Sequence, residues 1–592
     1  MLTTLTAPAF AGTWYIEDGD ITISAGESGN NVTQNNETTY GDTGTIITNH
    51  DKDKASSNTV TIDANGKNDK VEVTLKDVNI DASRGSEAAV SVTGKGDTTI
   101  ELDGDNELKS GAGHAGLEHN KTDTSGELTI QDKDNNGSLE AAGGFKGAGI
   151  GSAGSNDAQV KITGGNITAT SDDWGAGIGS GSYGTGTVEI TGGEINATGG
   201  YLGAGIGGGC NGSGNVTISG GTITAAGSDG AAGIGGGYYN GATVTITGDA
   251  VIKNASSTKY GAGIGGGNGS DGNVTISGNA KIENATGGYG AAGIGGGAFS
   301  SPDKIGNGNV VIKDNAKIDN VQGGAYGAGI GGGIYGLSNV TIEGNTKVNA
   351  TGGAGGAAIG GGAGAENNSD NNGNQITIKS NENGSPTINA VGGGTDEGEK
   401  IVIGGAGIGA GCESNADADI TLEGKVTITA TAGKDNVAIG ANGIEQEFSG
   451  LAEGSSITRY DPEGNDITLP TDPVPAVPSS SGGSSADASV QESVFPGLVV
   501  TDKDGQRISY TSIRGNNVLS IRVGRFTASL RASLATLRQL RAEGIDTITF
   551  QTILCSTTLS VDELLAMGGE DTEVVLTHHI RSSALTVGGK AV

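Results

Sequence analysis

The chain has 592 residues, of which 114 are glycine, 9 are proline and 3 are cysteine. Glycine is more than twice as frequent as the typical ~7 %, but it lacks the every-third-residue period of collagen, and three cysteines are too few for a disulfide scaffold. The net charge of −33 repels polyanions, so no nucleic acid or anionic membrane is expected as a partner. No run of about 18 apolar residues predicts a transmembrane segment.

The extreme N-terminus suggests export. Ala9-Phe10-Ala11 has the small-x-small form of a signal-peptidase site, but no Lys or Arg precedes Lys52. Residues 1–11 are therefore interpreted as the remnant of a signal peptide whose basic start is missing. This predicts a bacterial extracellular protein, secreted or held at the cell surface; the alternative is an ordinary chain terminus.

Residues 12–110 hold short apolar stretches without a glycine motif, such as Ile21-Thr22-Ile23 and residues 71–75. Their alternation of apolar and polar residues predicts strands. We interpret this region as the first, wider coils and the cap of a longer β structure.

Residues 111–445 repeat the motif Gly-Ala-Gly-Ile-Gly, or a close variant, with first intervals of 28, 28, 28, 30 and 30 residues. A fixed period of this length indicates a solenoid, in which each repeat is one structural unit. The motif isoleucines are Ile150, Ile178, Ile206, Ile234, Ile264, Ile294, Ile330, Ile359, Ile408 and Ile439.

Each repeat contains three short apolar stretches, for example residues 216–218, residues 222–225 and the motif around Ile234. Glycine turns rather than helices separate them, so each strand must pair with its counterpart one repeat later. This predicts an all-β fold, a right-handed parallel β-helix with about three short strands per coil of 28–30 residues. Four asparagines that each precede a valine are expected to stack as an amide ladder inside a turn: Asn215, Asn273, Asn309 and Asn339.

Residues 446–495 contain five prolines and a Ser/Gly run, which predicts a linker. In residues 496–592, the leucines at 530, 534, 537 and 540 share one helical face, residues 547–550 and 574–576 alternate as strands, and a short helix is expected over residues 561–567. These elements predict a small α+β domain. From residue 491 on, eight Arg and two Lys balance ten Asp and Glu. This neutral domain is the expected contact for a cell-surface or protein partner.

The aromatic residues between 145 and 335 all lie four or five residues from a motif isoleucine. Stacked coils would align them in two ridges beside a flat floor of glycine. Aromatic rings pack against the C–H faces of sugars, while Asn, Asp and Thr can meet the hydroxyl groups. The alternative is that the rings only cover the corners of the coil. Besides Phe145, the carbohydrate-binding candidates are Trp174, Tyr183, Tyr201, Tyr238, Tyr239, Tyr260, Tyr289, Phe299, Tyr326 and Tyr335.

Calcium is the one cofactor that the sequence suggests. Asp132, Asp134 and Asn136, followed by Gly137, place oxygen ligands at alternate positions, as in the opening of a calcium loop. The closing glutamate of such loops is replaced by Gly143. The alternative is an acidic turn that binds no ion.

Catalysis is not expected. Asp172 and Asp173, with Asp229 two coils later, could form an inverting glycosidase pair, but no histidine or arginine lies near them in the sequence. No Ser/His/Asp or Cys/His arrangement is detectable.

Several segments resemble a known family: Ser110-Gly-Ala-Gly-His114-Ala-Gly-Leu117, Glu127-Leu-Thr-Ile, residues 137–144 and Gly147-Ala-Gly-Ile-Gly. They are similar to the secreted carbohydrate-binding β-helix proteins of clostridia and related gut bacteria, over roughly residues 55–445. The resemblance implies a pectin-lyase-like right-handed β-helix that binds calcium and plant polysaccharide. Fold similarity to pectate lyases does not imply lyase activity.

The sequence thus predicts non-catalytic, calcium-assisted binding of a polysaccharide or glycan through the repetitive face and its aromatic residues. One alternative is a surface adhesin or stalk that presents the C-terminal domain. A second alternative is a polysaccharide lyase or glycoside hydrolase.

Overall fold

The structure is a computed structural model that describes residues 11–298, 301, 304–367, 373–395, 403–473, 497–502, 507–508, 510–515, 517–523, 527–552, 556–569, 572–579 and 582–591. The chain divides into two compact units, one that holds a solenoid as far as Ile467 and one that holds the C-terminal domain. The predicted signal-peptide remnant, except Ala11, lies outside the described residues. None of the helices in the described ranges is long and apolar enough to cross a membrane.

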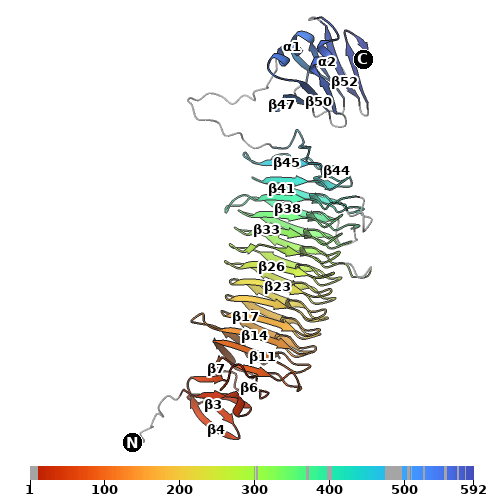
Figure 1. The fold of residues 1–592 in the computed structure, drawn as a ribbon. Helices are drawn as coiled ribbons and strands as arrows, with labels where there is room; N and C mark the ends of the chain where they lie inside the picture. The colour runs from red at the N-terminus through yellow and green to blue at the C-terminus, as the bar shows by residue number, and fades with distance from the viewer. Residues whose placement is uncertain are drawn as a thin grey trace, which may run out of the picture. The chain divides into compact units, whose positions relative to one another are not determined.

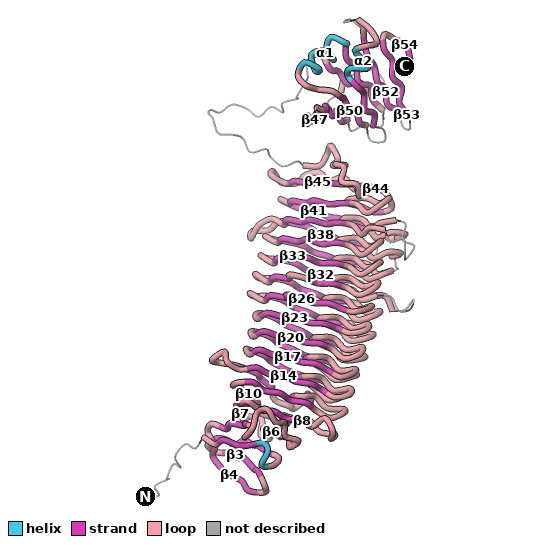
Figure 2. Tube along the Cα trace, in the orientation of Figure 1, coloured by secondary structure: helices cyan, strands magenta, loops and turns pink. Residues whose placement is uncertain are grey.

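The larger unit is a right-handed parallel β-helix with three short strands per coil, which confirms the predicted fold (Figure 1, Figure 2). Each strand pairs in parallel register with the equivalent strand of the next coil, so that Ile162 pairs with Ile190, Ile167 with Ile195 and Ile178 with Ile206. Like residues therefore stack in columns. The strands form a fourteen-stranded sheet and a 31-stranded sheet.

The 31-stranded sheet contains two stacks of equivalent strands. The Ile–Gly stack consists of β15 (Ile150–Gly151), β18 (Ile178–Gly179), β21 (Ile206–Gly207), β24 (Ile234–Gly235), β27 (Ile264–Gly265), β31 (Ile294–Gly295), β34 (Ile330–Gly331), β37 (Ile359–Gly360), β40 (Ile408–Gly409) and β43 (Ile439–Ala441). The Val-Thr-Ile stack consists of β16 (Asp157–Ile162), β19 (Gly186–Ile190), β22 (Gly214–Ile218), β25 (Ala242–Ile246), β28 (Gly272–Ile276), β32 (Gly308–Ile312), β35 (Ser338–Glu343), β38 (Asn374–Lys379) and β41 (Ala418–Glu423).

The fourteen-stranded sheet forms the remaining side of the coil. Its strands are β8 (Asn79–Asp81), β11 (Asp105–Lys109), β14 (Ser138–Gly143), β17 (Asn166–Ser171), β20 (Glu194–Thr198), β23 (Thr222–Gly227), β26 (Val251–Ser257), β29 (Lys281–Ile282), β30 (Ala285–Thr286), β33 (Lys317–Gln322), β36 (Lys347–Thr351), β39 (Thr387–Val391), β42 (Thr427–Thr431) and β45 (Ser456–Tyr460). Inward Ile, Val and Ala from all three sides form one continuous core.

The predicted amide ladder forms only in part, and on a strand rather than inside a turn, because Asn215 stacks on Thr243 and not on another asparagine. Asn273 and Asn309 are register partners on β28 and β32, and Asn309 Nδ2 donates to Asn273 Oδ1 at 2.9 Å. Because the valine that follows each asparagine points into the core, the asparagine itself must point outward. A separate ladder runs through turns, where Asn345 donates to Asn315 and Asn315 donates to Asn279, at 3.1 and 3.3 Å.

The N-terminal end of the solenoid is covered by antiparallel strands. β2 (Ile21–Gly26), β3 (Gly29–Gln34) and β4 (Glu37–Asp42) pair in sequence, and Trp14 Nε1 donates to Asp42 Oδ2 at 2.9 Å. The other elements here are β1 (Thr13–Tyr15), the short helix η1 (Ile16–Asp18), β5 (Thr45–Thr48), β6 (Val60–Ala64), β7 (Lys70–Lys76), β9 (Val90–Gly94), β10 (Asp97–Asp103), β12 (Leu117–Lys121) and β13 (Leu128–Gln131).

The other end of the solenoid extends into the range predicted as a linker. β45 pairs in parallel with β42, and β44 (Ile444–Glu445) folds back on β43. Here the fully buried Arg459 donates to Glu445 Oε2 at 2.5 Å and to the carbonyl of Gln446 at 2.7 Å. Solenoid pairing therefore continues past residue 445, and residues 474–495 of the predicted linker lie outside the described ranges.

The C-terminal unit has the predicted α+β composition. One sheet contains β46 (Leu498–Thr501), β49 (Ala528–Ser533), β52 (Glu573–His579), β53 (Ser582–Val587) and β54 (Lys590–Ala591), and the other contains β47 (Thr511–Gly515), β48 (Val518–Arg522), β50 (Thr547–Gln551) and β51 (Ser556–Ser560). Helices α1 (Leu534–Ala542) and α2 (Val561–Leu565) pack on their core. Leu530 lies in β49, so it is not part of the predicted helical face.

Candidate functional site

In the described residues, turns precede and follow the Ile–Gly strands, and the predicted aromatic residues other than Phe299 lie in these turns. The entry turn precedes the strand, at residues 172–175 in the coil of Ile178, and the exit turn follows it, at residues 180–184. Each turn contains one position with left-handed backbone. In the entry turns it is held by Lys146, Trp174, Leu202, Gly230, Tyr260, Gly290, Tyr326 and Gly355, and in the exit turns by Ser155, Tyr183, Asn211, Tyr239, Gly269, Tyr335 and Gly364.

Bulky aromatic residues at these positions carry backbone strain. Trp174, Tyr183 and Tyr260 have φ angles of 66°, 67° and 56°. This conformation costs a residue with a Cβ roughly 1 kcal/mol or more, whereas glycine adopts it freely. Glycine holds the equivalent positions in other coils, at Gly230 in the coil before Tyr260 and at Gly269 three coils after Tyr183. Folding alone therefore does not explain the aromatic residues.

The flat glycine floor predicted between the ridges is wrong. Every residue from Gly175 to Ser182 is buried. The exit turn of each coil closes over the entry turn of the preceding coil, where Cys210 N donates to the carbonyl of Trp174 at 2.7 Å and Tyr238 N donates to that of Leu202 at 3.1 Å. The glycine motif is thus a tightly packed, buried segment of each coil. The exposed surface is formed by the turns themselves.

The entry turns carry a ridge of six aromatic residues, all named in the sequence analysis: Phe145, Trp174, Tyr201, Tyr260, Tyr289 and Tyr326. Tyr201, Tyr289 and Tyr260 are 50 %, 42 % and 40 % exposed. Rings from successive coils touch, with centroid distances of 5.3 Å between Phe145 and Trp174, 6.2 Å between Tyr260 and Tyr289, and 5.7 Å between Tyr289 and Tyr326. We call this set the entry ridge.

The exit turns carry a sparser set, the exit ridge, which consists of Tyr183, Tyr238, Tyr239 and Tyr335. Tyr238 and Tyr239 stack with a centroid distance of 3.8 Å, and Lys304 Nζ lies 4.2 Å from the Tyr239 ring centroid. Burial, together with a hydrogen bond to Tyr239, raises the pKa of Tyr238 to about 12. The predicted residue Phe299 lies outside the described residues.

The predicted calcium loop forms an acidic cluster with a residue that the sequence did not suggest. Oxygens of Asp132, Asp134 and Glu101 all lie within 4.8 Å of one another. Asp132 accepts from the backbone N–H groups of Asn136 and Gly137 at 3.2 and 3.0 Å. Lys133 donates its backbone N–H to Glu101 at 2.7 Å, and its ammonium lies 3.3 Å from Glu101. The turn is therefore held by hydrogen bonds within the protein. The carboxylate oxygens of the cluster are also of the kind that calcium prefers.

The three aspartates considered for catalysis have different surroundings. Asp229 forms an ion pair with Lys259 at 3.2 Å. Burial, and then repulsion by Asp172, raise the pKa of Asp173. The backbones of Asp173 and Tyr201 form an isolated parallel β-bridge between successive coils. The two carboxylates therefore have different surroundings, with Asp229 held by a cation and the pKa of Asp173 raised.

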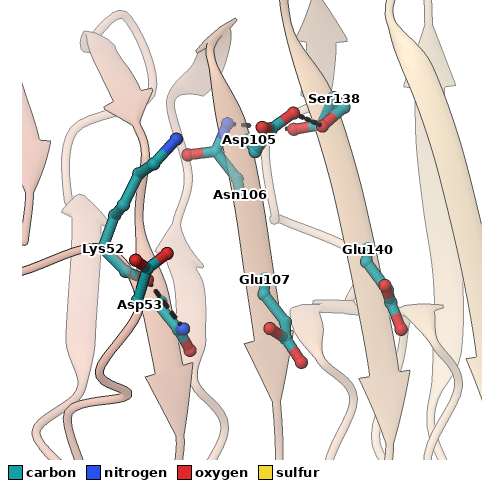
Figure 3. Close-up of a pocket in the computed structure, with 8 residues that line it drawn as sticks. Lys52, Asp53, Asp105, Asn106, Glu107, Ser138 and Glu140 are labelled. Carbon is teal, nitrogen blue, oxygen red and sulfur yellow. Dashed lines mark hydrogen bonds between the residues drawn. The ribbon is translucent and has the colours of Figure 1, made fainter.

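A groove of about 490 Å³ lies on the outer face of the fourteen-stranded sheet near its first strands (Figure 3). Its lining residues are Lys52, Asp53, Asn79, Asp105, Asn106, Glu107, Ser138 and Glu140. Sequence reasoning missed this groove. The signal lies in one outward column, where Glu107 and Glu140 are followed in later coils by Thr168, Asn196 and Thr224. Only the strand register reveals that these residues form a column.

Comparison with known proteins agrees with the fold. Four stretches, residues 160–182, 188–210, 216–238 and 274–298, match the family model described as Beta helix repeat. Each stretch runs from a Val-Thr-Ile strand to the exit turn after the next Ile–Gly strand. Searches of curated proteins and of solved structures gave no match. The repeat matches and the solenoid together fit a β-helix family.

Proposed function

We propose that this protein is a non-catalytic extracellular module that binds a polysaccharide along the entry and exit ridges. The observation that carries the proposal is the placement of exposed aromatic rings on strained turn positions. Tyr260 occupies left-handed backbone where both neighbouring coils use glycine, Gly230 and Gly290, and Tyr183 occupies a position that Gly269 holds three coils later. A residue that is retained against its conformational preference is a candidate for function.

The chemistry of the ridges suits a sugar polymer. Aromatic faces pack against the C–H groups of sugar rings, and their rigidity keeps the entropic cost of binding low. Coils rise by ~4.8 Å, so the ridges repeat along the solenoid axis and match a ligand that also repeats. The calcium-binding role proposed for Asp132, Asp134 and Asn136 adds a point at which acidic sugars could be bridged to the protein.

Retention on insoluble polysaccharides tests the proposal. The triple variant Tyr201→Ala, Tyr260→Ala and Tyr289→Ala should lose retention at least tenfold while keeping a wild-type circular dichroism spectrum. Tyr40→Ala is the matched control, because Tyr40 is 76 % exposed but lies on β4, away from both ridges. Wild-type retention by the triple variant would contradict the proposal.

Two further arms of the assay address calcium and catalysis. Loss of retention in chelator, reproduced by Asp132→Asn with Asp134→Asn, is the result expected if calcium assists binding. The absence of new reducing ends or unsaturated products is expected if the module only binds. Product formation that is lost in Asp173→Asn would instead assign an enzyme.

A second function, a stalk that presents the C-terminal domain, is favoured by the division of the chain into two compact units. A stalk predicts that removal of residues 497–592 abolishes attachment to a cell-surface or protein partner, whereas ridge substitutions have no effect. The ridge proposal predicts the reverse for polysaccharide retention.

A further inference from the structure

The groove on the fourteen-stranded sheet is a defined concave surface with an unusual lining. Its floor is formed by the outward side chains of β8, β11 and β14, and the loop at Lys52 and Asp53 borders it (Figure 3). This loop is tied to β8, because Asn79 Nδ2 donates to the carbonyl of Lys52 at 3.0 Å. A volume of about 490 Å³ lies in the range of small-ligand sites.

The lining combines four carboxylates with one ammonium group. Asp105 accepts from Ser138 Oγ at 3.0 Å, Glu107 forms an ion pair with Lys109, and Lys52 lies 3.7 Å from Asp77. Within the described part of the chain, the side chains of Asp53 and Glu140 form no hydrogen bond or ion pair, although the charge of Lys109 also attracts Glu140. The groove therefore retains negative charge and free acceptor oxygens.

The carboxylates are spread out rather than gathered on one point. Within the described ranges, three acidic groups with oxygens within 4.8 Å of one another occur at Glu101, Asp132 and Asp134, outside this groove. A single divalent cation needs converging oxygens. An extended ligand with several donors fits the groove better, because each carboxylate can accept from a different hydroxyl or ammonium group.

We propose that this groove binds an amino-sugar unit, a hexosamine with a free ammonium group, at one end of a longer sugar chain. The inference rests on the proposed function in taking a sugar as the ligand, and it adds a charged subsite to the aromatic ridges. The groove and the entry ridge are connected along the chain. β14 carries Glu140 and ends at Gly143, two residues before Phe145 in the first aromatic entry turn. At ~3.3 Å per residue, Glu140 and Phe145 are separated by roughly 17 Å of chain.

Isothermal titration with defined tetramers tests the subsite on the full chain. The probes are the β-1,4-linked tetramer of glucosamine, its fully N-acetylated form and the glucose tetramer. The glucosamine tetramer should bind at least tenfold more tightly than the other two, and added salt should weaken it because the attraction is between charges. The double variant Glu107→Gln, Glu140→Gln should lose this preference at least tenfold.

Glu194→Gln is the matched control, because Glu194 is an exposed acid on β20 of the same sheet and lies outside the groove. It should bind the glucosamine tetramer like the wild type. Equal binding of all three tetramers, or wild-type affinity in the double variant, would overturn the inference. Binding of Ca²⁺ by the wild type that the double variant loses, without any binding of the glucosamine tetramer, would also overturn it.

The result separates this inference from the ridge proposal. The variant Tyr201→Ala, Tyr260→Ala, Tyr289→Ala should keep the preference for the glucosamine tetramer while it loses retention on insoluble polymer. If polymer retention is unaffected in that variant but the groove variant loses tetramer binding, the ridge proposal fails and the groove remains as the sugar site.

Discussion

At the left-handed turn positions, the residues that are present differ from those that folding alone would favour. Tyr183 and Tyr260 have φ angles of 67° and 56°, whereas glycine holds the equivalent positions at Gly269, three coils after Tyr183, and at Gly230, in the coil before Tyr260. Tyr183 is 57 % exposed and Tyr260 is 40 % exposed, so a large part of each residue lies open to solvent. Their retention is therefore best explained by contact with a ligand, and the strain itself offers a test.

Tyr183→Gly and Tyr260→Gly should separate stability from binding. Glycine removes the left-handed penalty of roughly 1 kcal/mol per site, which offsets its greater backbone entropy in the unfolded chain. We expect an unchanged or higher melting temperature together with weaker polysaccharide retention. Thermal unfolding and the retention assay measure the two effects. A marked fall in melting temperature would show that the rings stabilise the coil instead.

A buried histidine should make the stability of the solenoid depend on pH. His119 is 2 % exposed, and its Nδ1 lies 3.0 Å from the carbonyl of Gln159. Burial lowers the pKa of His119. The unfolded chain therefore takes up the proton first as the pH falls below the ordinary value of ~6.5, and the free energy of unfolding should fall with it.

His119→Gln keeps a donor for the Gln159 carbonyl but cannot titrate. Urea unfolding about one pH unit above and one below ~6.5 should show a smaller loss of stability at the lower pH in this variant than in the wild type. An identical loss in both proteins would rule out His119 as the source.

At the scale of elements, the two-residue Ile–Gly strands are too short to be stable by themselves. They form because each is clamped between identical strands above and below, with Ile178, Ile206 and Ile234 fully buried. The glycine of each strand allows this close stacking. A Cβ built on Gly207, which has φ of 131°, would lie 2.0 Å from the carbonyl oxygen of Gly235.

Gly207→Ala should therefore destabilise the solenoid by more than ~2 kcal/mol, since it combines a strained φ with backbone overlap. Gly394→Ala is the matched control, because a Cβ at Gly394 meets nothing within 4 Å. The urea midpoint should fall clearly for the first variant and little for the second. Equal urea midpoints of the two variants would show that the coils accommodate the added methyl group without a loss of stability.

At the scale of the solenoid as a whole, the two ends need protection, because an open strand edge would pair with another molecule. The hairpin β2–β3–β4 covers one end, and the fold-back of β44 with the buried Arg459 closes the other. Solenoids generally require such terminal caps for solubility. The caps leave the regular coils between them to carry binding surfaces.

Arg459→Met should weaken the C-terminal cap. It leaves Glu445 without its cation, and breaking a buried pair costs about 3–5 kcal/mol. We expect local unfolding of residues 439–460, seen as faster hydrogen exchange there, and concentration-dependent association in light scattering. Lys434→Met, an exposed cation in the same coil, should do neither. Slow exchange and a monomeric state in Arg459→Met would contradict this role of the arginine.

Much of the fold could be predicted because each coil repeats a local rule. The spacing of the motif isoleucines and the alternation in residues 216–218 are enough to require parallel pairing one repeat apart. The end of the solenoid is harder to predict, since β45 is followed by no further glycine motif and yet pairs with β42. The spacing of Leu530 predicts a place on a helix, but pairing with β52 holds this residue in a strand.

The sequence by itself determined the β-helix, its period and the position of the aromatic residues relative to the motif isoleucines, because these depend on neighbours along the chain. Only the tertiary structure decided which surfaces are open. Hydrogen bonds between turns of successive coils bury the glycine motif; for example, Cys210 N donates to the carbonyl of Trp174. Strand register brings Glu107 beside Glu140, 33 positions apart in the chain, to line a groove. Such contacts follow from the stacking of whole coils, and no local pattern encodes them.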